Sequence, residues 1–191
     1  MKTLIFLFEP GCVVPTFMLM NFAVITILLH RKLNCHAGGL HDIMFHVKQL
    51  TVSEAGQEDY TSIHALIKKE LGYPHVEYEK LRNRLDIMKS DARHSTIVAK
   101  LDGRVAGFIG MVKGVAYNID GEILQITALA VLEEMQNKGI GAKLLESAEE
   151  FAISNNIQII TLTSRLHRAK SHSFYEGRGY EKKSFGFRKE L

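Results

Sequence analysis

One stretch of the sequence carries the residue types from which a phosphate-binding loop is built. Residues 122–131 are an apolar run typical of a β-strand and residues 133–138 are polar. Gly139 and Gly141 then open an amphipathic segment typical of a helix. The first backbone N–H groups of a helix have no intrahelical partner and lie at the positive end of its dipole. Because glycines let an anion approach the backbone closely, the stretch predicts a site for phosphate groups.

The spacing around these glycines excludes the common nucleotide-binding motifs. The sequence contains no G-x-x-x-x-G-K-[ST] motif, and neither a third glycine nor a ribose-binding acidic residue completes a dinucleotide fingerprint. A glycine pair at a helix start is also found in ordinary tight turns, so the pair alone does not identify the ligand. A second pattern, at residues 174–180, supplies the missing context.

Together the two patterns resemble the signatures of the GNAT superfamily of acyl-CoA-dependent N-acetyltransferases. The motif [QR]-x-x-G-x-[GA] stands here as QNKGIG, residues 136–141, and F-Y-x-x-x-G-[FY] stands as FYEGRGY, residues 174–180. The resemblance covers residues 44–191. It implies a three-layer α+β fold, with helices flanking a mixed and mostly antiparallel sheet. It also implies transfer of an acetyl group from acetyl-CoA to the primary amine of a small molecule, by direct attack in a ternary complex.

The resemblance further implies which residues bind the co-substrate, acetyl-CoA. The end of the 122–131 strand would pair with the pantetheine arm, and the N–H of Val131 would polarise the thioester carbonyl. The following loop and helix start would bind the pyrophosphate. The residues implied in this way are Leu129, Ala130, Val131, Gln136, Asn137, Lys138, Gly139, Ile140, Gly141 and Ala142.

Three residues are candidates for proton transfer. The resemblance implies that Tyr175 is the general acid that protonates the departing CoA thiolate; alternatively it is a core aromatic beside Phe174. Many relatives carry a glutamate base on the strand near Thr127, where this sequence has none. Glu122 is the nearest strand carboxylate and would act as base through a water chain, or else it is a surface acid beside a turn. His172, one helical turn before Tyr175, is a second candidate base or a packed or solvated histidine. Without either base, the amine arrives neutral.

The C-terminal stretch 164–191 is similar to the branch that contains aminoalkylphosphonate N-acetyltransferases. The shared positions are Ser164, Arg168, His172, Phe174, Tyr175, Gly179, Tyr180, Phe185, Phe187, Lys189 and Leu191. The similarity implies an anionic amine as acceptor, paired with an arginine. Two alternatives stay open: acetylation of a protein N-terminus or lysine, which needs an open groove, and a non-catalytic sensor that binds acyl-CoA.

The elements that must position these residues follow from periodicity and turn residues. Strands are expected at 44–50, 96–100, 105–112, 122–131, 157–163 and 180–188, and helices at 53–71, 75–88, 139–154 and 169–177. Ser53 is expected to cap the first helix. The strand at 157–163 is expected to be buried on both faces because it is almost continuously apolar.

The composition is that of a globular protein with one domain and an appendage. Of the 191 residues, 46% are hydrophobic and 24% are charged, which excludes collagen, a disordered polar chain and a coiled-coil rod. A net charge of +3 is too small to indicate nucleic-acid binding. No metal site is predicted, because the histidines after residue 43 form no i,i+4 pair and both cysteines, Cys12 and Cys35, precede residue 44.

Residues 1–43 form a hydrophobic leader, distinct from the acetyltransferase domain expected at 44–191. Residues 12–29 are uncharged and approach the length of a membrane-spanning helix, and Arg31 and Lys32 would then keep the domain in the cytoplasm. Alternatively, translation begins at Met44 and the leader is an over-extended start; a cleaved signal peptide fits poorly. A cytoplasmic enzyme is expected, with membrane contact only through such an anchor. Exposed strands near the C-terminus would favour a homodimer.

Overall fold

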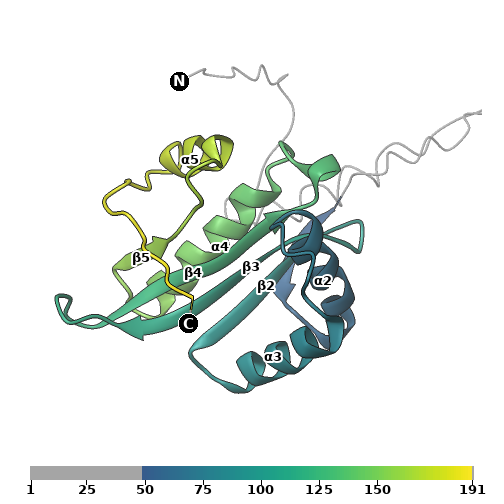
Figure 1. Cartoon of the computed structure of the whole chain (residues 1–191), viewed down its shortest axis with the longest axis horizontal. Coiled ribbons are helices and arrows are strands. Elements are labelled where there is room, and N and C mark those ends of the chain that lie inside the picture. The colour runs from purple at the N-terminus through teal and green to yellow at the C-terminus, as the bar shows by residue number, and fades with distance from the viewer. Residues whose placement is uncertain (1–48, 191) are drawn as a thin grey trace, which may run out of the picture. The chain divides into compact units, whose positions relative to one another are not determined.

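A five-stranded sheet forms the central layer of the domain (Figure 1). Its strands, in order across the sheet, are β1 (Leu50–Glu54), β2 (His94–Leu101), β3 (Arg104–Val115), β4 (Glu122–Val131) and β5 (Ile159–Leu162). All neighbours are antiparallel except β4 and β5, which are parallel. This computed structural model describes residues 49–190, so the leader at 1–43 and the proposed start at Met44 lie outside the described residues.

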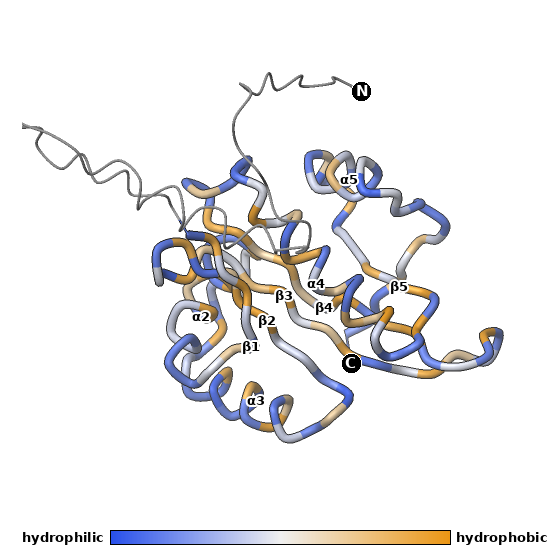
Figure 2. Tube along the Cα trace, turned by 180° about the vertical axis from the view of Figure 1, so that it is seen from behind, coloured by the Kyte–Doolittle hydropathy of each residue, from blue (hydrophilic) through white to orange (hydrophobic). Residues whose placement is uncertain are grey.

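Hydrophobic residues concentrate along the central strands (Figure 2). Residues 105–111 of β3 are all buried, because helices cover both faces of this strand. Side chains alternate between the two faces, so that Ile109 lies in one apolar cluster and Phe108 in the other. The core therefore has two layers that share the middle of the sheet.

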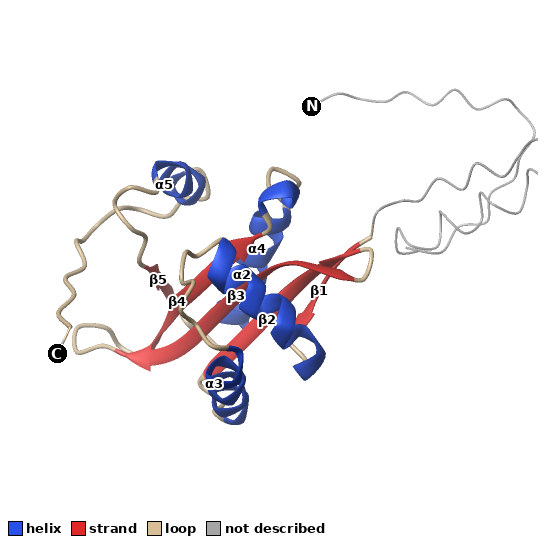
Figure 3. Cartoon of the chain, turned by 45° about the vertical axis from the view of Figure 1, so that its right-hand side comes forward, coloured by secondary structure: helices blue, strands red, loops and turns tan. Residues whose placement is uncertain are grey.

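Helices form the outer layers of the domain (Figure 3). α2 (Tyr60–Lys69) and α3 (Tyr78–Ser90) cover one face, and α4 (Ile140–Ser154) covers the other. α5 (Ala169–Glu176) packs its aromatic residues against the cluster that α4 forms with the sheet. Two short 3-10 helices, Gln57–Asp59 and Glu133–Met135, precede α2 and α4. The α+β class and the mostly antiparallel sheet expected from the sequence are confirmed. No helix within residues 49–190 has the length and apolarity needed to cross a membrane.

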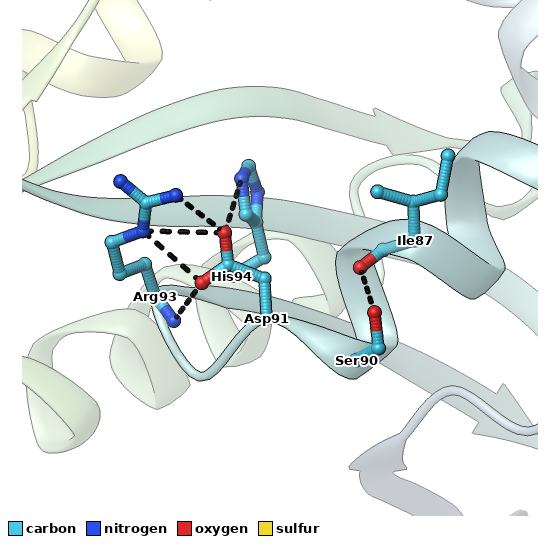
Figure 4. A network of polar contacts seen from close by, with 5 residues as sticks. All are labelled: Ile87, Ser90, Asp91, Arg93 and His94. Atoms are coloured by element: carbon cyan, nitrogen blue, oxygen red, sulfur yellow. Dashed lines mark hydrogen bonds and ion pairs between the residues drawn. The ribbon is translucent and has the colours of Figure 1, made fainter.

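A polar network fixes the connection between α3 and β2 (Figure 4). The Asp91 carboxylate accepts hydrogen bonds from the Arg93 guanidinium at 2.7–3.2 Å and from the Arg93 backbone N–H at 3.0 Å. These bonds, with the guanidinium contributing most, lower the pKa of Asp91 to about 2. The Ser90 hydroxyl donates to the Ile87 carbonyl at 2.7 Å. The turn into β2 is therefore held by an ionised carboxylate.

The first strand lies further along the chain than expected. Ser53 is inside β1, opposite Val98 of β2, and does not cap a helix. Helix α2 begins only at Tyr60, after a 3-10 turn whose Asp59 side chain accepts a hydrogen bond from the Gly56 N–H at 3.1 Å. A serine favours a helix start locally, but here backbone pairing with β2 outweighs that preference.

Of the two C-terminal strands expected, the one at 157–163 is present as β5 but is not buried on both faces, and the one at 180–188 is wrong. β5 has four residues and lies at the edge of the sheet, and its Ile159 is 37% exposed rather than buried. Residues 180–188 form no strand, and Phe187 is 98% exposed. An alternating aromatic pattern predicts a strand only if a neighbouring edge pairs with it, and no described strand pairs with this segment.

Candidate active site

The loop before α4 presents a row of free backbone donors. Gly139 is the N-cap of α4 with a left-handed φ of 79°, and Asn137 has a φ of 60°. Within residues 49–190, no hydrogen bond uses the backbone N–H groups of residues 137–142. These donors lie at the positive end of the helix dipole, and the loop therefore suits a phosphate-bearing ligand.

Two hydrogen bonds of Gln136 hold this loop in its conformation. Its backbone N–H donates to the Glu133 carbonyl oxygen at 3.2 Å, and its side-chain Nε2 donates to the Val131 carbonyl oxygen at 3.3 Å. Lys138 Nζ similarly donates to the Glu134 carbonyl oxygen at 2.8 Å. The side chain of Gln136 thus connects the loop to the end of β4. The backbone N–H of Gln136 already has an acceptor in the protein, so it is not available to a ligand.

The last residues of β4 have an open edge beside the loop. β5 pairs with β4 only at Ile123–Ile126, and Thr127 has no partner on β3, which makes it a β-bulge. The Leu132 N–H donates to the Ala106 carbonyl oxygen at 2.9 Å, so the alternating pattern turns the backbone groups of Leu129 and Val131 away from β3. An extended ligand can therefore pair with this edge as an added strand.

Close contacts explain two glycines of the site. A Cβ on Gly141 would lie 3.4 Å from Phe174 Cζ, so the start of α4 and the aromatic motif of α5 touch each other. A Cβ on Gly107, in β3, would lie 2.6 Å from the Ala130 carbonyl oxygen. Gly107 was not singled out from the sequence, although a glycine inside an apolar strand is a signal of close backbone approach.

Tyr175 follows Phe174 in α5 and packs against the core cluster that α4 forms with the sheet. Its ring centroid is 5.5 Å from that of Phe174 and 6.0 Å from that of Tyr180. Burial raises the pKa of Tyr175, and the nearby Arg168 guanidinium opposes this rise. Within residues 49–190 the Tyr175 hydroxyl makes no hydrogen bond to the protein. It is therefore a protonated and uncommitted donor at neutral pH.

The two candidate bases, Glu122 and His172, lie in different parts of the fold. Glu122 begins β4, seven residues before Leu129, so the strand separates them by about 23 Å. Glu122 is exposed there and pairs with Val115, at the opposite end of the strand from Leu129. His172 Nε2 lies 3.0 Å from the Arg165 carbonyl oxygen, to which it must donate a proton. His172 is thus engaged in holding the turn before α5.

A shallow pocket of about 270 Å³ lies at the α2–α3 connection. Its lining residues are Gly72, Tyr73, Pro74, His75, Val76, Glu77, Lys80 and Arg84. Lys80 Nζ pairs with Glu77 Oε1 at 3.0 Å, whereas Arg84 makes no ion pair within the described residues. The Arg165 guanidinium stacks on the Tyr73 ring, 4.9 Å from its centroid, so the pocket adjoins the segment that leads into α5. Residues 49–190 contain no group of three His, Cys, Asp or Glu side chains arranged to hold a metal ion.

Known proteins share this sequence and architecture. The model of the acetyltransferase (GNAT) family matches residues 60–180. The aminoalkylphosphonate N-acetyltransferase of Salmonella typhimurium is 31% identical over 137 residues, which are 72% of this chain and 88% of that enzyme. A GNAT family acetyltransferase from Staphylococcus aureus has a TM-score of 0.62 at 26% identity, covering 74% of this chain and 98% of the other.

A structure solved with the cofactor also has this fold. The aminoglycoside N-acetyltransferase AAC(6')-Iy, in complex with CoA, has a TM-score of 0.66 at 12% identity, covering 75% of this chain and 97% of the other. The family match covers more than half of the chain. It includes β4, α5 and the loop with the free N–H groups of residues 137–142, called the donor loop below. The resemblance that the two motifs carry is thereby confirmed. The chain belongs to the acetyltransferase (GNAT) family and is an acyl-CoA-dependent N-acetyltransferase.

Proposed function

We propose that this enzyme transfers the acetyl group of acetyl-CoA to the primary amine of a small anionic molecule, by direct attack in a ternary complex. One observation carries the proposal: the free N–H groups of residues 137–142 adjoin the open edge of β4, and Phe174, the neighbour of Tyr175, contacts Gly141 at the start of α4. A pyrophosphate and an extended pantetheine arm need those two surfaces in that order. The relative whose name specifies aminoalkylphosphonates supports an acceptor that carries an acidic group.

Each part of the site has a distinct task in this proposal. Bound acetyl-CoA supplies an electrophilic thioester carbonyl. The donor loop binds the pyrophosphate, and the outward backbone groups of Leu129 and Val131 pair with the pantetheine arm. Because the Val131 N–H points away from β3, it is left to donate to the thioester oxygen. The Tyr175 hydroxyl, kept protonated by burial, gives its proton to the departing thiolate.

We also propose that the acceptor amine binds in its neutral form. Residues 123–132 of β4 and its end contain no carboxylate, and Glu122 lies about 23 Å from Leu129 along the strand. His172 donates its Nε2 proton to the Arg165 carbonyl oxygen, which leaves only Nδ1 to accept a proton. The acceptor therefore loses one proton to solvent before it binds. The second proton, released from the nitrogen after attack, returns to the tyrosinate that Tyr175 becomes when it protonates the thiolate.

A thiol-release assay with acetyl-CoA and a panel of amines tests the proposal. Tyr175→Phe is expected to lower kcat by about 100-fold while the Kd for CoA stays unchanged, because only the proton donor is lost. Tyr117→Phe is the matched control, since Tyr117 is fully exposed in the β3–β4 connection. Unchanged turnover in Tyr175→Phe would contradict the general-acid role. CoA binding without turnover of any amine would instead identify a non-catalytic sensor.

The acceptor class has its own test at the α2–α3 pocket. An arginine contact to an anion contributes about 1.5–3 kcal/mol, so Arg84→Ala is expected to raise KM for an aminoalkylphosphonate by about 10- to 100-fold. The KM of an uncharged amine of similar size should not change. If Arg84→Ala changed the KM of both acceptors equally, the proposal of an anionic acceptor would be wrong.

A further inference from the structure

The last turn of α2 touches the turn that leads into the donor loop. Glu70 Oε1 accepts a hydrogen bond from the Glu133 backbone N–H at 3.3 Å, and Lys69 Nζ lies 3.7 Å from Glu134 Oε2. Glu133 and Glu134 begin the 3-10 turn directly before Gln136. The end of α2 is thus connected to the side of the site that binds CoA.

The same end of α2 is held by an arginine from far along the chain. Arg168 Nη2 donates to the Glu70 carbonyl oxygen at 3.2 Å and to the Leu71 carbonyl oxygen at 3.0 Å. Carbonyls at the end of a helix have no intrahelical partner and form the negative pole of its dipole, which favours a cation. The chain turns away directly afterwards at Gly72, which has a left-handed φ of 75°. Arg168 therefore adds a distant cap to the local one, in which the Tyr73 N–H donates to the Ile67 carbonyl oxygen at 3.2 Å.

Arg168 is also the first residue of the segment that carries Tyr175. It is the N-cap of α5, and Tyr175 follows seven residues later, two helical turns along the same face. His172 lies between them on that face, and its bond to the Arg165 carbonyl oxygen holds the preceding turn closed. Arg165 itself stacks on Tyr73. Residues 165–175 are consequently fixed to the end of α2 at their N-terminal side.

We infer that Arg168 is a positioning residue: by binding the Glu70 and Leu71 carbonyl oxygens, it sets where α5 holds the Tyr175 hydroxyl relative to the donor loop. The inference rests on the proposed role of Tyr175 as general acid. It differs from the role implied by sequence resemblance, in which an arginine here pairs with the anion of the acceptor. Nη2 of Arg168 is already committed to two backbone oxygens of the protein.

Kinetics of Arg168→Ala test the inference. A misplacement of the acid of about 1 Å is expected to lower kcat about 10- to 100-fold, whereas the acceptor KM and the Kd for CoA change by less than about twofold. Arg168→Lys should recover most of kcat, because the lysine Nζ can donate to both carbonyl oxygens. Lys170→Ala, an exposed change in the same helix, is the control and should behave as wild type. Thermal unfolding of each variant checks that it is folded, and Arg168→Gln replaces the alanine variant if that one is not.

A double-mutant cycle with Tyr175→Phe separates positioning from substrate binding. If Arg168 acts through the tyrosine, adding Arg168→Ala to Tyr175→Phe lowers kcat by no more than about twofold further. If the two effects multiply, or if Arg168→Ala raises the acceptor KM with kcat unchanged, the inference is overturned and Arg168 contacts the substrate. Wild-type kcat in Arg168→Ala together with an impaired Tyr175→Phe overturns the inference alone. Wild-type kcat in Tyr175→Phe overturns the proposed general acid, and the inference with it.

Discussion

Replacing Gly107 by alanine is expected to force β3 and β4 apart at the active site. The added Cβ would lie 2.6 Å from the Ala130 carbonyl oxygen, 3.1 Å from Val131 Cγ2 and 3.2 Å from Leu144 Cδ1. An unstrained carbon–oxygen contact is about 3.3–3.6 Å long, so the strands must separate by about 0.7 Å or more. The nearest atom belongs to the β4 backbone, and Leu144 comes from the packed helix α4, so no flexible side-chain end can absorb the shift.

Overpacking of this kind costs about 1–3 kcal/mol, which corresponds to a fall in Tm of roughly 4–12 °C for a domain of this size. Gly114→Ala is the matched control on the same strand, because a Cβ there meets nothing within 4 Å. Its Tm should stay within about 2 °C of the wild-type value. Calorimetry of CoA binding should also show a weaker Kd for Gly107→Ala, since Ala130 lies between Leu129 and Val131, whose backbones would pair with the pantetheine in the proposed function. If both variants unfold at the same temperature, the close approach at Gly107 does not exist in solution.

Three further predictions concern the donor loop, the α3–β2 turn and the acceptor. Gly141→Val should weaken CoA binding about tenfold in calorimetry by displacing Phe174, whereas Gly141→Ala, with its Cβ at 3.4 Å, should bind normally. The pKa of Asp91 is about 2 in the folded protein, below the unfolded value of about 3.9, so its stabilising effect is present above pH 4 and lost as the pH falls toward 2. Urea unfolding should therefore show Asp91→Asn less stable than wild type at pH 6, with the difference shrinking at pH 3. If the amine binds neutral, kcat/KM rises with pH up to the pKa of the free acceptor, and two acceptors of different pKa give different profiles; one common apparent pKa would indicate a protein base.

The central hairpin and the motif helix could be predicted from sequence because their signals are local. Asp102 and Gly103 both have positive φ in the tight turn between β2 and β3, as such a pair at a hairpin predicts. The bounds of β4 match the apolar run 122–131, and α4 ends where Asn155 follows it. Each of these features depends on a few neighbouring residues, so the sequence alone was sufficient.

The features that could not be predicted depend on partners far away in the chain. An apolar run such as 157–163 does not reveal whether strands lie on both sides of it, and β5 lies at the edge. Glu122 shares a strand with Leu129, but only the extended geometry shows that they are at opposite ends of it. Arg168 was expected beside the acceptor, and its bonds to Glu70 and Leu71 connect positions almost 100 residues apart. The sequence predicted which elements carry the donor loop and Tyr175, but it did not predict the long-range contacts that hold these elements in place.

The unpaired residue Thr127 changes which face of the sheet the later side chains of β4 point to. Ile126 and Leu129 both face α4, and Ala128 and Ala130 face α2 and α3, although strict alternation would put residues 126, 128 and 130 on one side. Deleting Thr127 would therefore restore plain alternation and leave residues 128–131 on the faces they now occupy, whereas deleting a residue elsewhere in the strand would exchange the faces of the residues that follow. A library of single-residue deletions across this strand should therefore find its best tolerated deletion at Thr127 and the sharpest losses of folding at paired positions on either side of it.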